Sequence, residues 1–132
     1  MSLLVPVSWG ELFDKLTILD IKSSRIKDSA KLGNIRKELQ LLSDIAKEAE
    51  QRNAAAKTSF ADVTRQLREV NESLWDIEDE IRDCERKKNF GSRFIELARA
   101  VYKTNDRRAA LKYRINELLG SELVEEKSYQ EY

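Results

Sequence analysis

The feature that most constrains the fold is an apolar stripe that recurs at helical spacing with few residues to interrupt it. Between residues 58 and 88, apolar side chains return at every third or fourth position over three heptads. They are Val63, Leu67, Val70, Leu74, Ile77, Ile81 and Cys84. Residues at this spacing share one face of an α-helix, so the segment predicts a long amphipathic helix. Because the 132 residues include four glycines and one proline, we expect an all-α fold.

Four segments show this periodicity, and short breaks separate them. The predicted helices lie at about residues 8–27, 29–52, 58–88 and 92–119. Their short connections favour an antiparallel up-down-up-down four-helix bundle. At this length the chain is expected to form a single domain, residues 1–132, around one core. Residues 1–7 are predicted to be an extended lead-in, and residues 120–132 a short acidic tail.

Local signals set the ends of the predicted helices. Ser8 followed by Glu11 matches a capping box, in which Ser8 caps the helix and the Glu11 side chain reaches back to the Ser8 backbone. A second break is expected at residues 53–59. Ser92 is predicted to cap the last helix, and Gly120 suits the left-handed position after its end.

Charge is balanced over the whole chain and segregated along it. The 24 basic residues offset the 24 acidic ones, so nothing favours binding to nucleic acid or to an anionic membrane. No apolar run reaches the roughly 18 residues of a membrane span, and the N-terminus lacks the charged region of a signal peptide. We therefore expect a cytoplasmic protein. Among the charged residues, those at 91–119 are mostly basic and those at 76–85 mostly acidic. These opposite charges predict that the third and fourth helices are neighbours.

The lack of histidine and the single cysteine exclude several kinds of site. One cysteine, Cys84, cannot form an internal disulfide or a thiolate zinc cage. Without histidine there is no imidazole base, no nucleophile–histidine dyad and no Glu-x-x-His motif of di-iron bundles. The sequence therefore predicts no metal site and no cofactor. Any catalysis would rely on carboxylates as acid or base, or on electrostatic positioning.

Polar side chains interrupt the inward face of the last predicted helix. The apolar stripe of that helix consists of Phe94, Leu97, Val101, Leu111, Ile115 and Leu119. At about 100° per residue, the same sector contains Asn105, Arg108, Lys112 and Asn116. Burying such groups is costly unless each finds a partner. These four residues, which we call the polar ladder, therefore need internal counter-charges or a ligand.

Counter-charges are expected from the first and third helices. Asp20 projects into the apolar sector of the first helix. Glu78 and Glu85 lie one heptad apart along the edge of the third helix, with Arg82 between them. The candidate ligand-binding residues are therefore Asp20, Glu78, Arg82, Glu85, Asn105, Arg108, Lys112 and Asn116. Three interpretations stay open: a closed network that fixes the helix register, a pocket for a small anion, or a hydrated ladder at the bundle edge.

The pattern favours a non-catalytic binding or interaction module whose interhelical polar cluster holds a small anionic ligand. The alternative is a small all-helical enzyme that acts by electrostatic positioning, as the helical chorismate mutases do. Asp14, Asp20 and Arg25 place charges on the first helix, but the paired acid spacing of that enzyme's first helix is absent.

Apolar residues outside the main stripes predict a contact surface. On the first two helices they are Ile18, Ile21, Leu41 and Ile45. A monomeric bundle would leave several of them exposed, so we expect a homodimer through this face.

Five blocks of the sequence resemble a family of small bacterial all-helical proteins, a domain of unknown function. The blocks are VPVSWGELFDKLTILDIK from Val5, KLGNIRKEL from Lys31, LWDIEDEIR from Leu74, FIELARAVY from Phe94 and GSELVEEKSY from Gly120. The resemblance covers nearly the whole chain, implies an all-helical domain and carries no catalytic role onto any residue. It also favours a docked tail over a disordered one, through Glu125, Glu126, Lys127 and Tyr129.

Overall fold

The computed structural model describes residues 1–52 and 57–132, and this part of the chain is all-α. Its helices are α1 (Trp9–Arg25), α2 (Ser29–Arg52), α3 (Lys57–Arg86) and α4 (Ser92–Leu119). The predicted four-helix, all-α fold class is confirmed. Of the predicted break at residues 53–59, residues 53–56 lie outside the described residues, and residues 57–59 already belong to α3. No described helix is both long and apolar enough to cross a membrane.

The helix ends follow two of the predicted signals and depart from two others. The Ser8 hydroxyl accepts a hydrogen bond from the Glu11 N–H at 3.1 Å, so Ser8 is the N-cap of α1. The Glu11 side chain does not complete a capping box, because its carboxylate binds a lysine of α4 instead. Gly91, and not Ser92, is the N-cap of α4, and Ser92 is its first helical residue. Gly120 has the predicted left-handed conformation, with φ 61° and ψ 46°.

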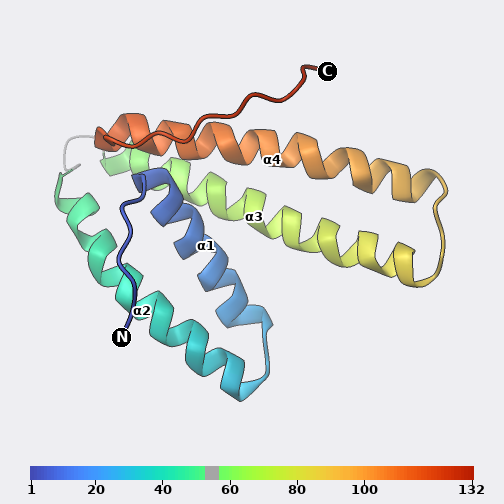
Figure 1. The fold of residues 1–132 in the computed structure, drawn as a ribbon, viewed down its shortest axis with the longest axis horizontal. Helices are drawn as coiled ribbons and strands as arrows, with labels where there is room; N and C mark the ends of the chain where they lie inside the picture. The colour runs from blue at the N-terminus through green and yellow to red at the C-terminus, as the bar shows by residue number, and fades with distance from the viewer. Residues whose placement is uncertain (53–56) are drawn as a thin grey trace.

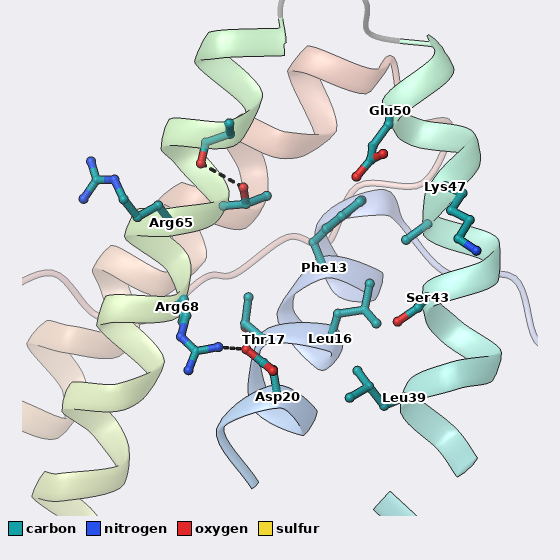
Figure 2. A pocket seen from close by; sticks show the side chains of 13 residues that line it. Phe13, Leu16, Thr17, Asp20, Leu39, Ser43, Lys47, Glu50, Arg65 and Arg68 are labelled. Carbon is teal, nitrogen blue, oxygen red and sulfur yellow. Dashed lines mark hydrogen bonds and ion pairs between the residues drawn. The ribbon is translucent and has the colours of Figure 1, made fainter. Parts of the chain in front are cut away.

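Two antiparallel hairpins form the fold (Figure 1). α3 and α4 lie side by side, as their opposite charges predicted, and an ion pair of 2.5 Å joins Arg93 to Glu80 near their connection. α1 and α2 form the second hairpin, which is splayed away from the first. α1 packs against all three other helices, whereas α2 packs mainly on α1. A broad groove of about 700 Å³ therefore lies between α2 and α3, with α1 as its floor (Figure 2).

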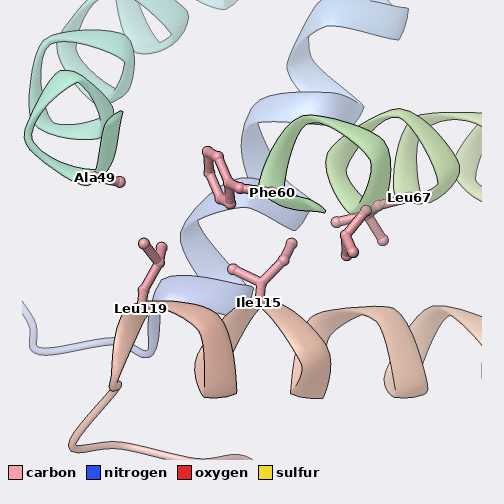
Figure 3. Close-up of a cluster of buried hydrophobic side chains, with 6 residues drawn as sticks. Ala49, Phe60, Leu67, Ile115 and Leu119 are labelled. Carbon is pink, nitrogen blue, oxygen red and sulfur yellow. The ribbon is translucent and has the colours of Figure 1, made fainter. Parts of the chain in front are cut away.

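A core cluster of buried apolar side chains lies at the end of the molecule where the two hairpins meet. It consists of Ala49, Phe60, Val63, Leu67, Ile115 and Leu119, contributed by α2, α3 and α4 (Figure 3). Trp9 and Phe13 of α1 pack against this cluster, and the Phe13 ring meets the Phe60 ring edge to face at 4.9 Å. The apolar stripes read from the sequence are therefore the surfaces that join the helices.

The four residues of the expected dimer face do not share one exposed surface. Ile21 is 1% exposed and belongs to the core, so it cannot contribute to a contact surface. Ile18 of α1 is half-buried and faces a cleft that residues of α3 and α4 also line. Leu41 and Ile45 are 54% and 50% exposed. Dimerisation stays a prediction for Leu41 and Ile45, of which Ile45 lines a pocket together with Leu3, Leu4, Val5 and Val7 of the apolar lead-in.

The tail docks along α4. After the left-handed turn at Gly120 the chain reverses direction and follows α4 back (Figure 1). The Ser121 hydroxyl accepts a hydrogen bond from the Trp9 N–H at 3.3 Å. At the far end, the Tyr132 hydroxyl donates to the Asp106 carboxylate, and its ring meets that of Tyr102 at 5.2 Å. The tail is thus held at both ends.

Candidate functional site

α1 and α4 approach each other closely at Gly10. A Cβ atom at this position would overlap the backbone carbonyl oxygen of Lys112, so only glycine fits. The Gly10 N–H donates to the Asn116 side-chain oxygen at 2.7 Å, and Asn116 is 5% exposed. Asn116 of the polar ladder therefore fixes the register of α1 on α4 and is not available to a ligand through this oxygen.

Asp14 is the buried counter-charge of the ladder. It is 2% exposed, and its two oxygens accept from Arg108, from Nε at 2.8 Å and from Nη2 at 2.6 Å. Asn71 of α3 donates through Nδ2 to Asp14 Oδ1 at 3.0 Å and to the Thr17 hydroxyl at 2.8 Å. This bidentate pair with an amide partner joins α1, α3 and α4. Such a pair is strongly destabilised when one member is removed, because the other is left as a buried charge.

Lys112 is enclosed by carboxylates from three directions. Its ammonium group lies 2.7 Å from Glu11, 2.9 Å from Glu125 of the tail and 3.9 Å from Asp14, and its side chain is 13% exposed. Burial lowers the pKa of Lys112, but the hydrogen bonds to Glu11 and Glu125 outweigh this effect and raise it. The hydrogen bond from Lys112 lowers the pKa of Glu125. Lys112 is therefore charged and fully partnered.

The paired part of the ladder carries a surplus of negative charge. Glu11, Asp14 and Glu125 face only Arg108 and Lys112 within it. Around Lys112 the cluster matches the closed-network interpretation, because an added anion would have to displace a carboxylate of the chain itself.

Three predicted site residues lie away from this cluster. Asp20 forms an ion pair with Arg68 of α3 at the groove of Figure 2. Glu85 pairs with Lys88 at 3.7 Å, and the Arg82 side chain is 77% exposed. α1 meets α4 through Gly10 and Asp14, about three and two turns before Asp20. The expected placement of Asp20, Arg82 and Glu85 opposite the ladder is therefore not what the structure has.

Glu78, in contrast, shares a cleft with Arg108. The cleft has a volume of about 350 Å³ and lies between α1, α3 and α4. Its apolar wall consists of Ile18, Leu74 and Trp75. Its polar wall consists of Asn71, Glu78, Asp79, Asn105 and Arg108. We call it the Arg108 cleft.

The arginines that line the larger groove between α2 and α3 are already paired. Figure 2 shows its aromatic and aliphatic floor on α1, with charged side chains on the two flanking helices. Arg65 is bound by Asp62 at 2.5 Å and by Glu69 at 2.7 Å. Arg68 is bound by Asp20 and, at 2.9 Å, by Glu72. Both arginines of the groove are therefore neutralised by neighbours.

Sequence reasoning missed Asp14 as the central acid and omitted Asn71 from the site. A signal for Asp14 was present, because Gly10, Asp14, Thr17 and Ile21 recur at helical spacing. These residues form a second inward face of α1, directed at α3 and α4. Searching only for apolar residues could not reveal a face built from glycine, aspartate and threonine.

Comparison with family models, with curated proteins and with solved structures finds no match to this chain in any of the three. The resemblance of its sequence blocks to a bacterial helical family therefore stays a prediction. Within residues 1–52 and 57–132, no group of three or more histidine, cysteine or acidic side chains is placed to hold a metal ion.

Proposed function

We propose that the protein is a non-catalytic binding module and that its ligand site is the Arg108 cleft. The ligand is a small molecule with a carboxylate or a similar planar acidic group. A volume of about 350 Å³ suits such a ligand, and the mixture of one apolar wall with a few convergent polar groups is typical of small-molecule sites.

The unused hydrogen-bonding capacity of Arg108 carries this proposal. A guanidinium group has five N–H donors in a planar fork. Asp14 accepts from the edge formed by Nε and Nη2, and Asn105 accepts from Nη1 at 3.4 Å. Two N–H groups, one on each Nη atom, have no acceptor among the described residues. Nη1 and Nη2 together form the second edge of the fork, and N–H groups on that edge can bind a carboxylate bidentately.

Asn71 supplies a second unsatisfied group in the same cleft. Asn71 is 5% exposed, and its Nδ2 donates to Asp14 and Thr17. The opposite orientation of the amide would place its oxygen against the Asp14 carboxylate, so the Nδ2 assignment is the one that the site allows. In the described chain, no group donates to Asn71 Oδ1. A buried acceptor without a donor is costly, and a ligand donor in the cleft would remove that cost.

The enzyme alternative has one observation in its favour, since Glu78 and Arg108 line the same cleft. A mutase of the chorismate type needs cations that face the developing negative charge of the transition state. Here Arg108 is already neutralised by Asp14, and Lys112 is bound by two other carboxylates. Binding without catalysis is therefore the better-supported function. Conversion of chorismate by the purified protein, lost in Arg108→Lys, would favour the enzyme instead.

Titration of the ¹⁵N-labelled full chain with a panel of small carboxylates, amino acids and dicarboxylates tests the proposal. We expect at least one compound to shift the amide signals of Asn71, Trp75 and Asn105 in a saturable way. Arg108→Lys should weaken that binding about tenfold or more, because lysine can pair with Asp14 but has no second edge. The matched control is Arg36→Lys, an exposed arginine on α2, which should bind like the wild type. A panel in which no compound shifts these signals overturns the proposed function.

A further inference from the structure

We infer that the ligand of the Arg108 cleft is a zwitterion, with an ammonium group held by Glu78 and Asp79 beside Trp75 and an acidic group held by Arg108. This inference rests on the proposed function and names the class of molecule that the same cleft takes. The polar ladder alone indicated a simple anion, and we now expect a zwitterion in its place.

The charges of the cleft favour a ligand that carries a cation. Glu78 and Asp79 line it beside Arg108, and the charge of Arg108 is already offset by Asp14. Glu78 pairs with Arg82 at 3.4 Å, but Arg82 is 77% exposed, so this pair is weak. Asp79 has no ion-pair partner within the described part of the chain. A ligand with only an acidic group would therefore meet two carboxylates and no uncompensated cation.

Trp75 adds a surface that suits an ammonium group. Its half-buried indole lies on the apolar wall of the cleft, one turn of α3 before Glu78 and Asp79. The guanidinium of Arg25 already lies 5.8 Å from the ring centroid, held there by Asp76 at 2.5 Å. The Trp75 ring and an acid of α3 therefore already hold one cation together, which shows that the indole is placed to take part in such a contact.

The two charged ends of the cleft are separated along α3. Asn71 and Arg108 both donate to Asp14 Oδ1, so they mark the same level of the molecule. Glu78 follows Asn71 by seven residues on the same helix, a rise of about 10 Å. The side chains of Arg108 and Glu78 shorten the span that a ligand must cover. A molecule whose ammonium and carboxylate are joined by several carbons, such as an ω-amino acid, fits this separation better than an α-amino acid.

Three probes of equal chain length separate the contributions of the two charges: 6-aminohexanoate, hexanoate and hexylamine. The readouts are the backbone amides of the cleft and the indole N–H of Trp75, which Trp75→Phe distinguishes from the other tryptophan, Trp9. We expect 6-aminohexanoate to bind about tenfold more tightly than either single-charge probe, because only it pairs at both ends. Hexanoate or hexylamine binding as tightly as 6-aminohexanoate would contradict the inference.

A double variant tests the acids directly. Glu78→Gln with Asp79→Asn should weaken 6-aminohexanoate binding about tenfold and leave hexanoate binding unchanged or stronger. The control is Glu80→Gln on the same helix, whose carboxylate binds Arg93 and does not line the cleft. Unchanged affinity of the double variant for 6-aminohexanoate overturns the inference.

The two proposals fail in different ways. If hexanoate or a dicarboxylate binds at Asn71 and Asn105 while the ammonium group contributes nothing, the zwitterion is wrong and the binding function stands. If neither these probes nor the wider panel shifts the cleft signals, both are wrong.

Discussion

The two sides of Arg108 differ in how completely their hydrogen bonds are made. Toward α1, its Nε–Nη2 edge is paired with a carboxylate that is 2% exposed, and the neighbouring Lys112 is enclosed by Glu11 and Glu125. Toward the cleft, Nη1 has one long contact to Asn105, and one N–H group on each Nη atom has no acceptor among the described residues. The buried Asn71 oxygen likewise lacks a donor among them. The hydrogen bonds on the Asp14 side are therefore complete, whereas donors and an acceptor on the cleft side lack partners.

This difference shows how polar groups on an inward helix face can serve two purposes at once. The paired edge of Arg108 is held rigidly by Asp14, and that rigidity fixes the direction of the unpaired edge. Binding groups positioned in this way lose little conformational freedom when a ligand arrives. The two sides therefore predict different consequences of mutation: the paired side should control stability, and the cleft side should control binding.

The largest expected effect on stability comes from removing the central acid. Asp14→Ala leaves Arg108 partly buried without its counter-charge and should lower the free energy of unfolding by about 3–5 kcal/mol. Asp20→Ala, which removes an exposed carboxylate from the same helix, should cost about 0–1 kcal/mol. Urea unfolding followed by circular dichroism measures both. Equal losses would mean that the Asp14 network is no more important to the fold than a surface ion pair.

The contact between α1 and α4 can be tested with a pair of glycines. Gly10→Ala forces a methyl group into the Lys112 backbone and should cost about 1–3 kcal/mol, as overpacking of a tight contact does. Gly33 lies inside α2 with no atom within 4 Å of an added Cβ, so Gly33→Ala should stabilise the protein by about 0.5–1 kcal/mol. Thermal unfolding of the two variants should therefore shift in opposite directions. A shift of the same sign in both would contradict the close approach of α1 to α4.

The smallest effect is expected at the tail. Glu125→Gln removes one of two carboxylates on Lys112 and should cost at most about 1 kcal/mol at neutral pH, since the Glu125 side chain is 50% exposed. Its pKa in the folded protein is below the ordinary value of 4.5, so its contribution is present above pH 4.5 and is lost as the pH falls through the lower folded value. The stability difference between wild type and variant should thus disappear on acidification. A difference that persists at low pH would show that the tail is held by other contacts.

The helices were predictable because their apolar stripes are long and regular. Val63, Leu67 and Val70 pack into the core as their spacing required, and the opposite charges of the third and fourth helices made them neighbours. The polar ladder was also predictable, since Asn116 and Lys112 lie on the inward face of α4 and are largely covered. Periodicity within one helix is a local property, and the sequence carries it directly.

The partners of the ladder were not predictable in the same way. Which acid meets Arg108 depends on how α1 crosses α4, and that crossing is set by the close approach at Gly10. α1 is also covered on two sides, with Phe13 toward the core cluster and Asp14 toward α4, so a single stripe could not describe it. Asp20 lies on the same face of α1 as Phe13, which packs against the core cluster, and not on the face that meets α4. Glu125 reaches Lys112 only because the chain reverses at Gly120.

The most direct measurement of the central claim is nuclear magnetic resonance of the Arg108 side chain itself during titration with 6-aminohexanoate. The Nε–H signal reports the edge bound to Asp14. The signals of the two Nη hydrogens without an acceptor, one on Nη1 and one on Nη2, report the edge that faces the proposed ligand. If the two sides of Arg108 have separate roles, the Nη signals should shift to saturation while the Nε–H signal stays protected and nearly constant. Saturating binding at the cleft that leaves the Nη signals unchanged, or that releases the Nε–H from Asp14, would contradict this division of roles.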